Sequence, residues 1–210
     1  MKKYIKEFIY AILAGIAISI GCIVFLSVQN KVAGSILFAL GLLTILIFRL
    51  NLFTGKAPYI CTNKPKYIIF VGIVWLGNFV GSWSTAFLVK YTSVYNKIIE
   101  RCEEIAVAKS SDNLLSLLIL GVFCGILMFI AVDAFNKNAD IVNFYITLLI
   151  IFCVSVFILS GFEHSIADMF YFMLALPVKT WIIPLLVISI GNILGGNIFC
   201  LICTYVKRDL

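Results

Sequence analysis

The chain has 210 residues, of which 63% are hydrophobic and only 12% are charged, and its mean hydropathy is +1.13. A water-soluble domain of this composition would need a largely apolar surface, so the composition indicates an integral membrane protein in one domain, residues 1–210. The net charge of +6 comes from basic residues at the ends of apolar runs. Because these residues form no basic stripe with interleaved aromatics, we expect the lipid membrane as a partner and no nucleic acid.

Six apolar runs are long enough to span a bilayer, which takes roughly 17–25 helical residues. They cover residues 8–28, 33–50, 67–89, 113–132, 142–160 and 181–206. The basic start of the chain suggests a signal peptide, but the first run continues through Ser27 without a small-residue cleavage site. We therefore expect an uncleaved first helix. The longest polar connection, residues 93–113, predicts a short amphipathic helix outside the membrane.

An even number of spans places both termini on one side of the membrane, and the side richer in Lys and Arg is normally cytoplasmic. With the amino terminus inside, the inner segments hold the larger basic set: Lys2, Lys3, Lys6, Lys56, Lys64, Lys66, Lys137, Lys207 and Arg208. The outer segments hold Lys31, Lys90, Lys97, Arg101, Lys109 and Lys179. The distribution predicts a multi-pass protein of the inner (cytoplasmic) cell membrane with cytoplasmic termini.

The sequence contains an internal repeat. The matching strings are L-F-T-G at 52–55 with I-L-S-G at 158–161, G-N-F-V-G at 77–81 with G-N-I-L-G at 191–195, and the early glycines Gly15 with Gly121. The halves, about 1–92 and 108–210, each contain three apolar runs, so they must be inverted relative to the membrane. The second and fifth runs end in glycine and polar residues, which predicts helices broken at mid-membrane. Inverted repeats with paired broken helices are typical of transporters.

The segment S-G-F-E-H-S-I-A-D-M-F, residues 160–170, places Glu163, His164 and Asp168 in a region that is otherwise almost pure hydrocarbon. His164 is also the only histidine of the chain. Ionisable groups at membrane depth are costly and normally face a bundle interior or a watery path, so they indicate a functional site. The alternative is a loop at the membrane surface, where charge costs little.

Asn78 and Asn192 each place an amide inside an apolar helix, where it needs a partner. The most plausible partner is backbone freed by the breaks in the second and fifth helices. The seven cysteines are scattered, and Cys200 and Cys203 lie in an apolar helix without other ligand residues near them. We interpret them as packing residues and expect no metal site and no cofactor.

The segment 160–170, the L-F-T-G string and the G-N-x-x-G-G string resemble the formate/nitrite transporter family, over essentially the whole chain. Members of this family are pentameric inner-membrane channels or transporters for small monovalent anions. The resemblance implies an all-α, aquaporin-like fold: six transmembrane helices in two inverted three-helix repeats, with helices 2 and 5 broken. It also implies a homopentamer in which each subunit has its own pore.

The resemblance assigns roles to individual residues. The substrate-pore residues are His164, Thr54, Asn192 and Lys109; the hydrophobic constriction residues are Leu52, Phe53 and Phe157; the loop-supporting residues are Glu163, Asp168 and Asn78. The chain departs from the family pattern at Arg49-Leu50-Asn51, at Gly125 and at Asp168. These departures suggest a divergent branch, such as the hydrosulfide-type channels. Arg49 and Asp168 are candidates for a compensating ion pair.

A bare anion cannot cross an apolar ring cheaply, because desolvating a charge costs many kcal/mol. Lys109 would concentrate the anion in a vestibule, and Thr54 and Asn192 would hold it by hydrogen bonds. His164 would then lend a proton, so that a weak acid such as hydrosulfide, formate, nitrite or an acetate-sized anion crosses in its neutral form. The alternative is a plain hydrophobic gate in which His164 is a structural hydrogen-bonding residue.

Two other classes remain as alternatives. An intramembrane enzyme could use Glu163, His164 and Asp168 as acid, base or metal ligands. A single histidine, however, cannot form the usual zinc triads, and neither a serine elbow nor an H-E-x-x-H motif is present. A membrane assembly subunit would not require the mirrored breaks. The sequence therefore favours a transport protein over an enzyme.

Overall fold

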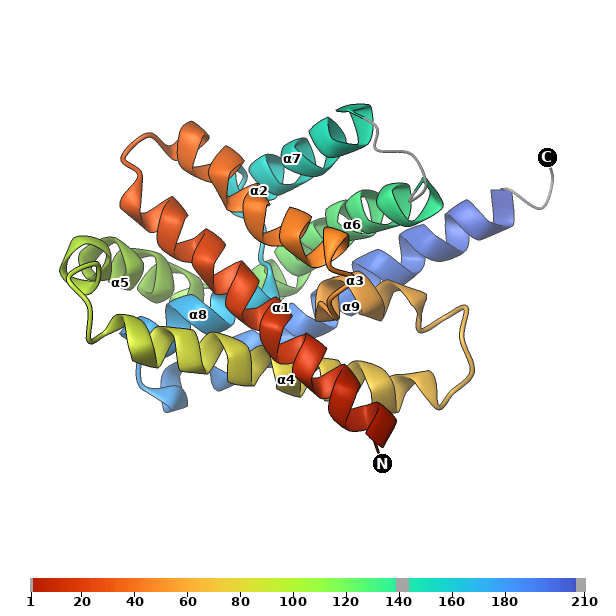
Figure 1. Ribbon diagram of the computed structural model, residues 1–210, viewed down its shortest axis with the longest axis horizontal. Helices are drawn as coiled ribbons and strands as arrows, with labels where there is room; N and C mark the ends of the chain where they lie inside the picture. Colours follow the sequence, from red (N-terminus) through yellow and green to blue (C-terminus); the bar gives the residue numbers. More distant parts are fainter. Residues whose placement is uncertain (1, 139–143, 207–210) are drawn as a thin grey trace.

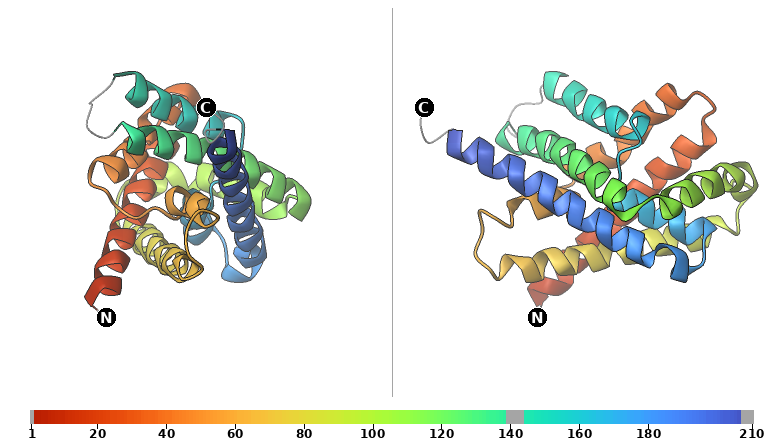
Figure 2. Two further views of the ribbon diagram at one scale, coloured as in Figure 1. Left: turned by 90° about the vertical axis from the view of Figure 1, so that its right-hand side faces the viewer. Right: turned by 180° about the vertical axis from the view of Figure 1, so that it is seen from behind.

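The computed structural model describes residues 2–138 and 144–206, and all regular structure in these residues is helical (Figure 1). The elements in chain order are α1 Lys2–Ser27, α2 Lys31–Ile47, α3 Phe53–Lys56, the 3-10 turn η1 Ala57–Tyr59, α4 Tyr67–Val89, α5 Tyr95–Ser111, α6 Leu114–Lys137, α7 Phe144–Leu159, α8 Ser165–Ala175 and α9 Val178–Val206. Two long pairs, α1 with α4 and α6 with α9, form the main packing contacts, and α2 packs against α7 (Figures 1 and 2). The short helices α3 and α8 lie between these pairs.

Each of the six predicted apolar runs contains a helix, and the connection 93–113 forms the predicted helix as α5. By length and composition, α1, α4, α6 and α9 are able to cross a membrane, whereas α2, α7 and α8 are shorter apolar helices. The first helix starts earlier than the run that predicted it, at Lys2. The start of the run 142–160, together with Lys207 and Arg208, lies outside the described residues.

The helices α2 and α7 end in the same way. Arg49 after α2 and Gly161 after α7 have positive φ, 53° and 69°. The N–H of Arg49 bonds to Leu46 O and that of Leu50 to Ile45 O; the N–H of Gly161 bonds to Ile158 O and that of Phe162 to Phe157 O. This is the hydrogen-bond pattern of a Schellman C-cap, which stops the helix and turns the chain away from its axis.

The equivalent caps fix the register of the internal repeat. Arg49 corresponds to Gly161, so His164 corresponds to Leu52, and α3 and α8 begin one residue after each of them. The expected match of L-F-T-G with I-L-S-G is therefore wrong by six positions: 52–55 is aligned with 164–167, and 158–161 with 46–49. The two strings are similar in letters, but L-F-T-G lies at the start of α3 and I-L-S-G lies at the end of α7.

Close helix packing shows that a second expected match of the repeat, Gly15 with Gly121, is also misaligned. A Cβ on Gly15 of α1 would lie 2.3 Å from Asn78 O, and a Cβ on Gly125 of α6 would lie 2.4 Å from Asn192 O. The counterpart of Gly15 is therefore Gly125, not Gly121. Both glycines let the backbones of crossing helices touch, in the manner of small-residue contacts between membrane helices.

The positive φ of Gly161 makes a testable prediction. Gly161 and Gly72, which lies inside α4, both have open space around the position of a Cβ, so they differ mainly in backbone conformation. Gly161→Ala should destabilise the protein by about 1 kcal/mol, because an L side chain is strained in the left-handed region. Gly72→Ala should stabilise it by up to about 1 kcal/mol, because alanine favours a helix interior. Thermal unfolding in detergent measures both; equal shifts of the same sign would contradict the assigned cap.

Candidate functional site

The polar centre of the structure is the pair formed by Thr54 and His164. Thr54 lies in the first turn of α3, and His164 is the residue that caps the amino terminus of α8. Thr54 Oγ1 and His164 Nε2 are 2.9 Å apart, and both side chains are almost completely buried, at 0% and 1% exposure. The two half-helices thus bring together residues that are far apart in the sequence.

The second ring nitrogen of His164 defines the direction of this hydrogen bond. Nδ1 accepts the backbone N–H of Ala167 at 3.2 Å, so it must carry a lone pair. A neutral imidazole has one N–H, which therefore lies on Nε2 and donates to the Thr54 hydroxyl oxygen. An imidazolium would have to give up the bond from Ala167. The ring is consequently arranged as a neutral hydrogen-bond donor, and this favours a hydrogen-bonding role for His164 over a proton-lending one.

The hydroxyl hydrogen of Thr54 has no acceptor among the residues that the structure describes. The oxygen already accepts from His164, so the Thr54 O–H is a buried donor without a partner among the described residues. Phe157 stacks on the imidazole, with ring centroids 5.3 Å apart and planes at 21°. One apolar ring and one unsatisfied donor therefore flank the same histidine.

The side-chain amides of Asn78 and Asn192 form hydrogen bonds with the backbone before α3 and α8. The Asn78 amide accepts from Phe53 N and donates to Ala11 O and Asn51 O. The Asn192 amide accepts from Ser165 N and donates to Gly121 O and Glu163 O. These are repeat-related partners, so each amide fixes one helix break to its neighbouring long helices.

Asn192 is one of the residues expected to bind the substrate. Its side chain is 0% exposed, and its amide donors and acceptor all bond to backbone. These bonds hold the start of α8, as those of Asn78 hold the start of α3. Phe53 is likewise held by its backbone N–H and is 3% exposed.

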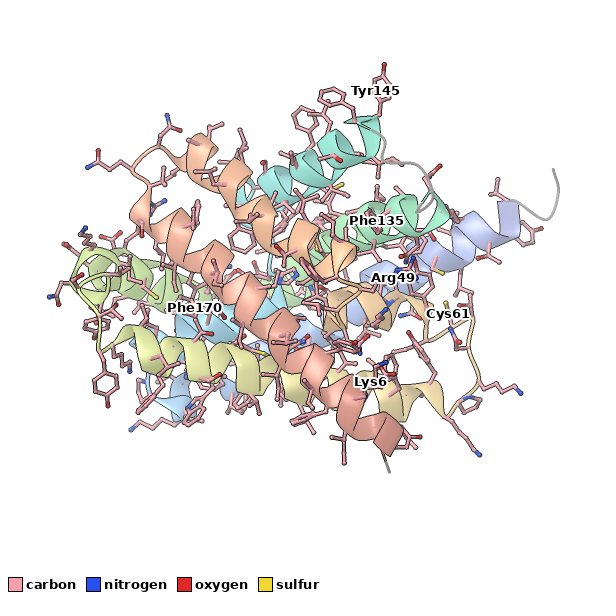
Figure 3. All side chains as sticks on the ribbon, in the orientation of Figure 1. Lys6, Arg49, Cys61, Phe135, Tyr145 and Phe170 are labelled. Atoms are coloured by element: carbon pink, nitrogen blue, oxygen red, sulfur yellow. The ribbon has the colours of Figure 1, made fainter. Side chains whose placement is uncertain are left out.

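Lys109, near the carboxyl end of α5, contacts two acidic residues. Its Nζ lies 2.5 Å from Glu163 Oε2 and 3.1 Å from Asp168 Oδ1. The proposed pairing of Asp168 with Arg49 is therefore wrong, because Asp168 binds Lys109 and Arg49 lies beside Phe135 in a different part of the fold (Figure 3). The Asp168–Lys109 contact joins residues of different helices and was not visible in the sequence.

Two cavities approach the central pair: the walls of one include His164, and the walls of the other include Leu52 and Gly55, which are two residues before and one residue after Thr54. One, which we name the Lys109 cavity, has a volume of about 450 Å³, and its walls include Lys109, Phe157, Glu163, His164 and Asp168. The other, the Arg49 cavity, measures about 280 Å³, and its walls include Arg49, Leu52, Gly55, Lys56 and Phe135. Several wall residues are repeat counterparts, such as His164 with Leu52 and Asp168 with Lys56.

The cations of the Arg49 cavity were not predicted as site residues. In the sequence, Arg49 is a departure from the family pattern and a candidate partner of Asp168, and Lys56 is an inner basic residue. The signal available in the sequence is their position, three residues before and one residue after the L-F-T-G string. Asn51, between them, binds the carboxylate of Glu7 at 2.7 Å through its amide.

Among the described residues, no group of three or more His, Cys, Asp or Glu side chains is arranged to hold a metal ion. Cys200 and Cys203 are free thiols on α9. The site consists instead of hydrogen-bond donors, apolar rings and one ion-paired lysine.

An all-helical arrangement, in the described residues, of four helices long enough to cross a membrane and a buried polar pair between two short helices is similar to that of membrane transport proteins. The family model for Formate/nitrite transporter matches residues 2–206, and the chain belongs to this family. Its members are transporters and channels, so the chain is placed among transport proteins of the membrane and not among enzymes.

Individual relatives agree with this placement. The chain is 22% identical over 242 residues to the formate channel FocA of Escherichia coli (strain K12), covering 94% of this chain and 84% of FocA. It is 26% identical over 211 residues to the nitrite transporter NirC of the same strain, covering 89% and 78% of the two chains. A solved structure described as a pentameric formate channel with formate bound shares the fold, with a TM-score of 0.84, 23% identity and 100% and 99% coverage.

The matching hydrogen-bond sets of the two asparagines make a stability prediction. Asn192→Leu should destabilise the protein by about 3 kcal/mol or more, because three buried backbone groups lose their partner and each costs about 1–3 kcal/mol. Asn78→Leu should have a similar effect, since it removes the repeat-related set. Thermal unfolding in detergent compares the two. A loss with Asn192→Leu but not with Asn78→Leu would contradict the equivalence of the breaks.

Proposed function

We propose that the protein is a channel or transporter that passes small monovalent anions of weak acids, of the formate, nitrite or hydrosulfide type, through a pore in each subunit. The observation that carries this proposal is the buried Thr54–His164 pair between two cavities, with the Thr54 O–H left without an acceptor. A donor without a partner in an apolar pore suits an anion, whose negatively charged atom is a strong hydrogen-bond acceptor.

The proposed path runs from one cavity to the other past the central pair. In the Lys109 cavity an anion meets Phe157 against the His164 ring, and in the Arg49 cavity it meets Leu52. Phe53 lies next to Leu52 and completes the apolar constriction. Arg49 and Lys56 line the Arg49 cavity, and their positive charge raises the local concentration of an anion before it enters the constriction from that side.

The proposed architecture follows from the breaks and their repeat register. The pieces α2 with α3, and α7 with α8, form two discontinuous spans, which with α1, α4, α6 and α9 make six. The halves 1–92 and 108–210 are inverted copies within one channel domain, residues 1–210. Inversion places the Lys109 and Arg49 cavities at opposite mouths of the pore, in an inner membrane with cytoplasmic termini.

The proposed assembly is a homopentamer. The structural neighbour with the same fold is described as pentameric, and each subunit of this chain contains its own polar pair and both cavities. Outward-facing apolar side chains are abundant on the described helices, which fits contact with lipid and with neighbouring subunits.

His164 acts in this proposal as a neutral donor. An anion that reaches the constriction accepts a hydrogen bond from the Thr54 O–H. The Nε2–H of His164 donates to the oxygen of the same hydroxyl and holds it in place. Lys109 sets the charge of its cavity and holds Glu163, the residue before His164, in position.

The direct test uses purified protein in liposomes with labelled formate and nitrite. We expect uptake of the anion by wild-type vesicles, release of the same anion unchanged, and no uptake by protein-free vesicles. Chemical conversion of the anion would support an enzyme, and absence of flux for formate, nitrite and hydrosulfide would contradict the proposal.

Thr54 offers a sharp variant pair. Thr54→Val keeps the shape but removes the O–H donor and orphans the Nε2–H of His164, so formate flux should fall about tenfold or more, from the loss of one hydrogen bond to a charged group at about 1.5–3 kcal/mol. Thr54→Ser retains the hydroxyl and should stay within a few-fold of wild type. Equal loss in both variants would assign the effect to packing instead of the donor.

The role of His164 is tested by the shape of the pH profile. His164→Asn keeps a buried amide donor but cannot carry a titrating proton. If the ring is a neutral donor, formate flux measured with equal pH on both sides should fall by a uniform factor, and its dependence on pH should keep its shape. A profile that becomes flat in the variant would instead support proton lending by the imidazole.

A further inference from the structure

Lys109, Glu163 and Asp168 form a charge cluster with one cation and two acids. Glu163 and Asp168 are buried, at 3% and 1% exposure, and both contact the same ammonium group. Two carboxylates with one lysine carry a net charge of −1. A net negative charge is costly in a buried site and is unsuited to the wall of a cavity that admits anions.

One oxygen of the cluster has no donor. Asp168 Oδ1 faces Lys109, but Asp168 Oδ2 is buried and has no hydrogen-bond partner among the described residues. The carboxyl groups of Glu163 and Asp168 meet at the same ammonium group, since Lys109 Nζ lies 2.5 Å from Glu163 Oε2 and 3.1 Å from Asp168 Oδ1. Two ionised carboxylates this close repel each other and are acceptors only, so a proton held by the pair removes the repulsion.

Among the described residues, Lys109 is the cation that forms ion pairs with Glu163 and Asp168; Lys31 and Arg101 also line the cavity but form no ion pair with these two acids. The other titratable groups near Asp168 are the thiols of Cys22 and Cys124 and the phenol of Tyr171, with His164 on the same turn. Thiols and phenols are neutral at neutral pH, and the His164 ring is held as a neutral donor. Arg101, on the wall of the same cavity, directs Nη1 to the carbonyl oxygens of Phe25, Leu26 and Val28.

We propose that Glu163 and Asp168 hold one proton between them, and that this proton-binding site controls the admission of anions to the Lys109 cavity. With the proton bound, the cluster of Lys109, Glu163 and Asp168 is neutral. When the proton leaves to water in the cavity, the cluster becomes −1 and repels an arriving anion. Flux should therefore be higher at low pH and fall as the pair loses its proton.

The second half of this inference rests on the proposed transport function, whereas the shared proton does not. Asp168 is also one of the positions at which the chain departs from the family pattern, in which this residue is often asparagine. An asparagine has no acid proton to share, so the site belongs to this chain's own residues.

The shared proton is tested without transport. Infrared spectroscopy of purified protein at neutral pH should show the carbonyl band of a protonated carboxylic acid. Asp168→Asn and Glu163→Gln should each abolish it, because the remaining carboxylate pairs with Lys109 and ionises. Glu104→Gln, which removes an exposed acid from the wall of the same cavity, should leave the band intact. Absence of the band in wild type, or its persistence in both cluster variants, would overturn the shared proton.

The admission role is tested by formate exchange in liposomes with equal pH on both sides, between pH 6 and 8, where formate itself remains ionised. Wild type and Glu104→Gln should lose flux several-fold as pH rises, whereas Asp168→Asn, which fixes the cluster in its neutral state, should give a nearly flat profile. A wild-type pH dependence that survives in Asp168→Asn would contradict the role. If wild type carries no formate at all, the proposed function fails, and the infrared result still decides the shared proton.

Discussion

The constraint on which the structure depends is the free backbone at two helix breaks inside an apolar protein. An unpaired N–H or C=O costs several kcal/mol where no water can reach it, so a broken helix needs partners from its neighbours. Asn78 and Asn192 supply them, each with one acceptor and two donors directed at backbone. With the breaks held in this way, the residues at the starts of α3 and α8 point at one another instead of into a continuous helix. The buried pair of Thr54 and His164 is thus a consequence of where the helices stop.

The same symmetry gives the two halves different chemistry. The caps at Arg49 and Gly161 are equivalent in backbone, but one carries a guanidinium and the other carries no side chain. Leu52 and His164 are counterparts, and so are Lys56 and Asp168. The Arg49 cavity is therefore lined by cations, whereas in the Lys109 cavity the lysine is bound to acids. The two repeats therefore share one backbone arrangement but differ in side chains. The Arg49 cavity is cationic, whereas the Lys109 cavity contains acids.

Much of the fold was predictable because it follows from composition and from length. Apolar runs of spanning length predict helices regardless of partners, and α5 was visible as a polar amphipathic connection. The repeat was recognised, but its register was misjudged, because true counterparts such as Leu52 and His164 share no chemistry and only their hydrogen bonds show the equivalence. A string comparison instead selects similar letters, and it matched the end of α7 with the start of α3.

The site was predictable in part. Membrane-depth polarity indicated His164, Glu163 and Asp168, and the family resemblance added Thr54 and Lys109. The partner of Asp168 was not predictable, since Lys109 is on another helix and its contact depends on how α5 packs on α8. The tautomer of His164 was not predictable either. It is set by the backbone N–H of Ala167, and because nearly every residue has a backbone N–H, the sequence does not show which one the ring contacts.

The central claim is that His164 rests as a neutral ring with its proton on Nε2. The chain contains a single histidine, so nitrogen-15 NMR of histidine-labelled protein in lipid reports on this ring alone. The structure predicts the resonances of a neutral imidazole with Nδ1 unprotonated and Nε2 protonated, unchanged across the neutral pH range. An imidazolium, or a neutral ring protonated on Nδ1, at neutral pH would contradict it.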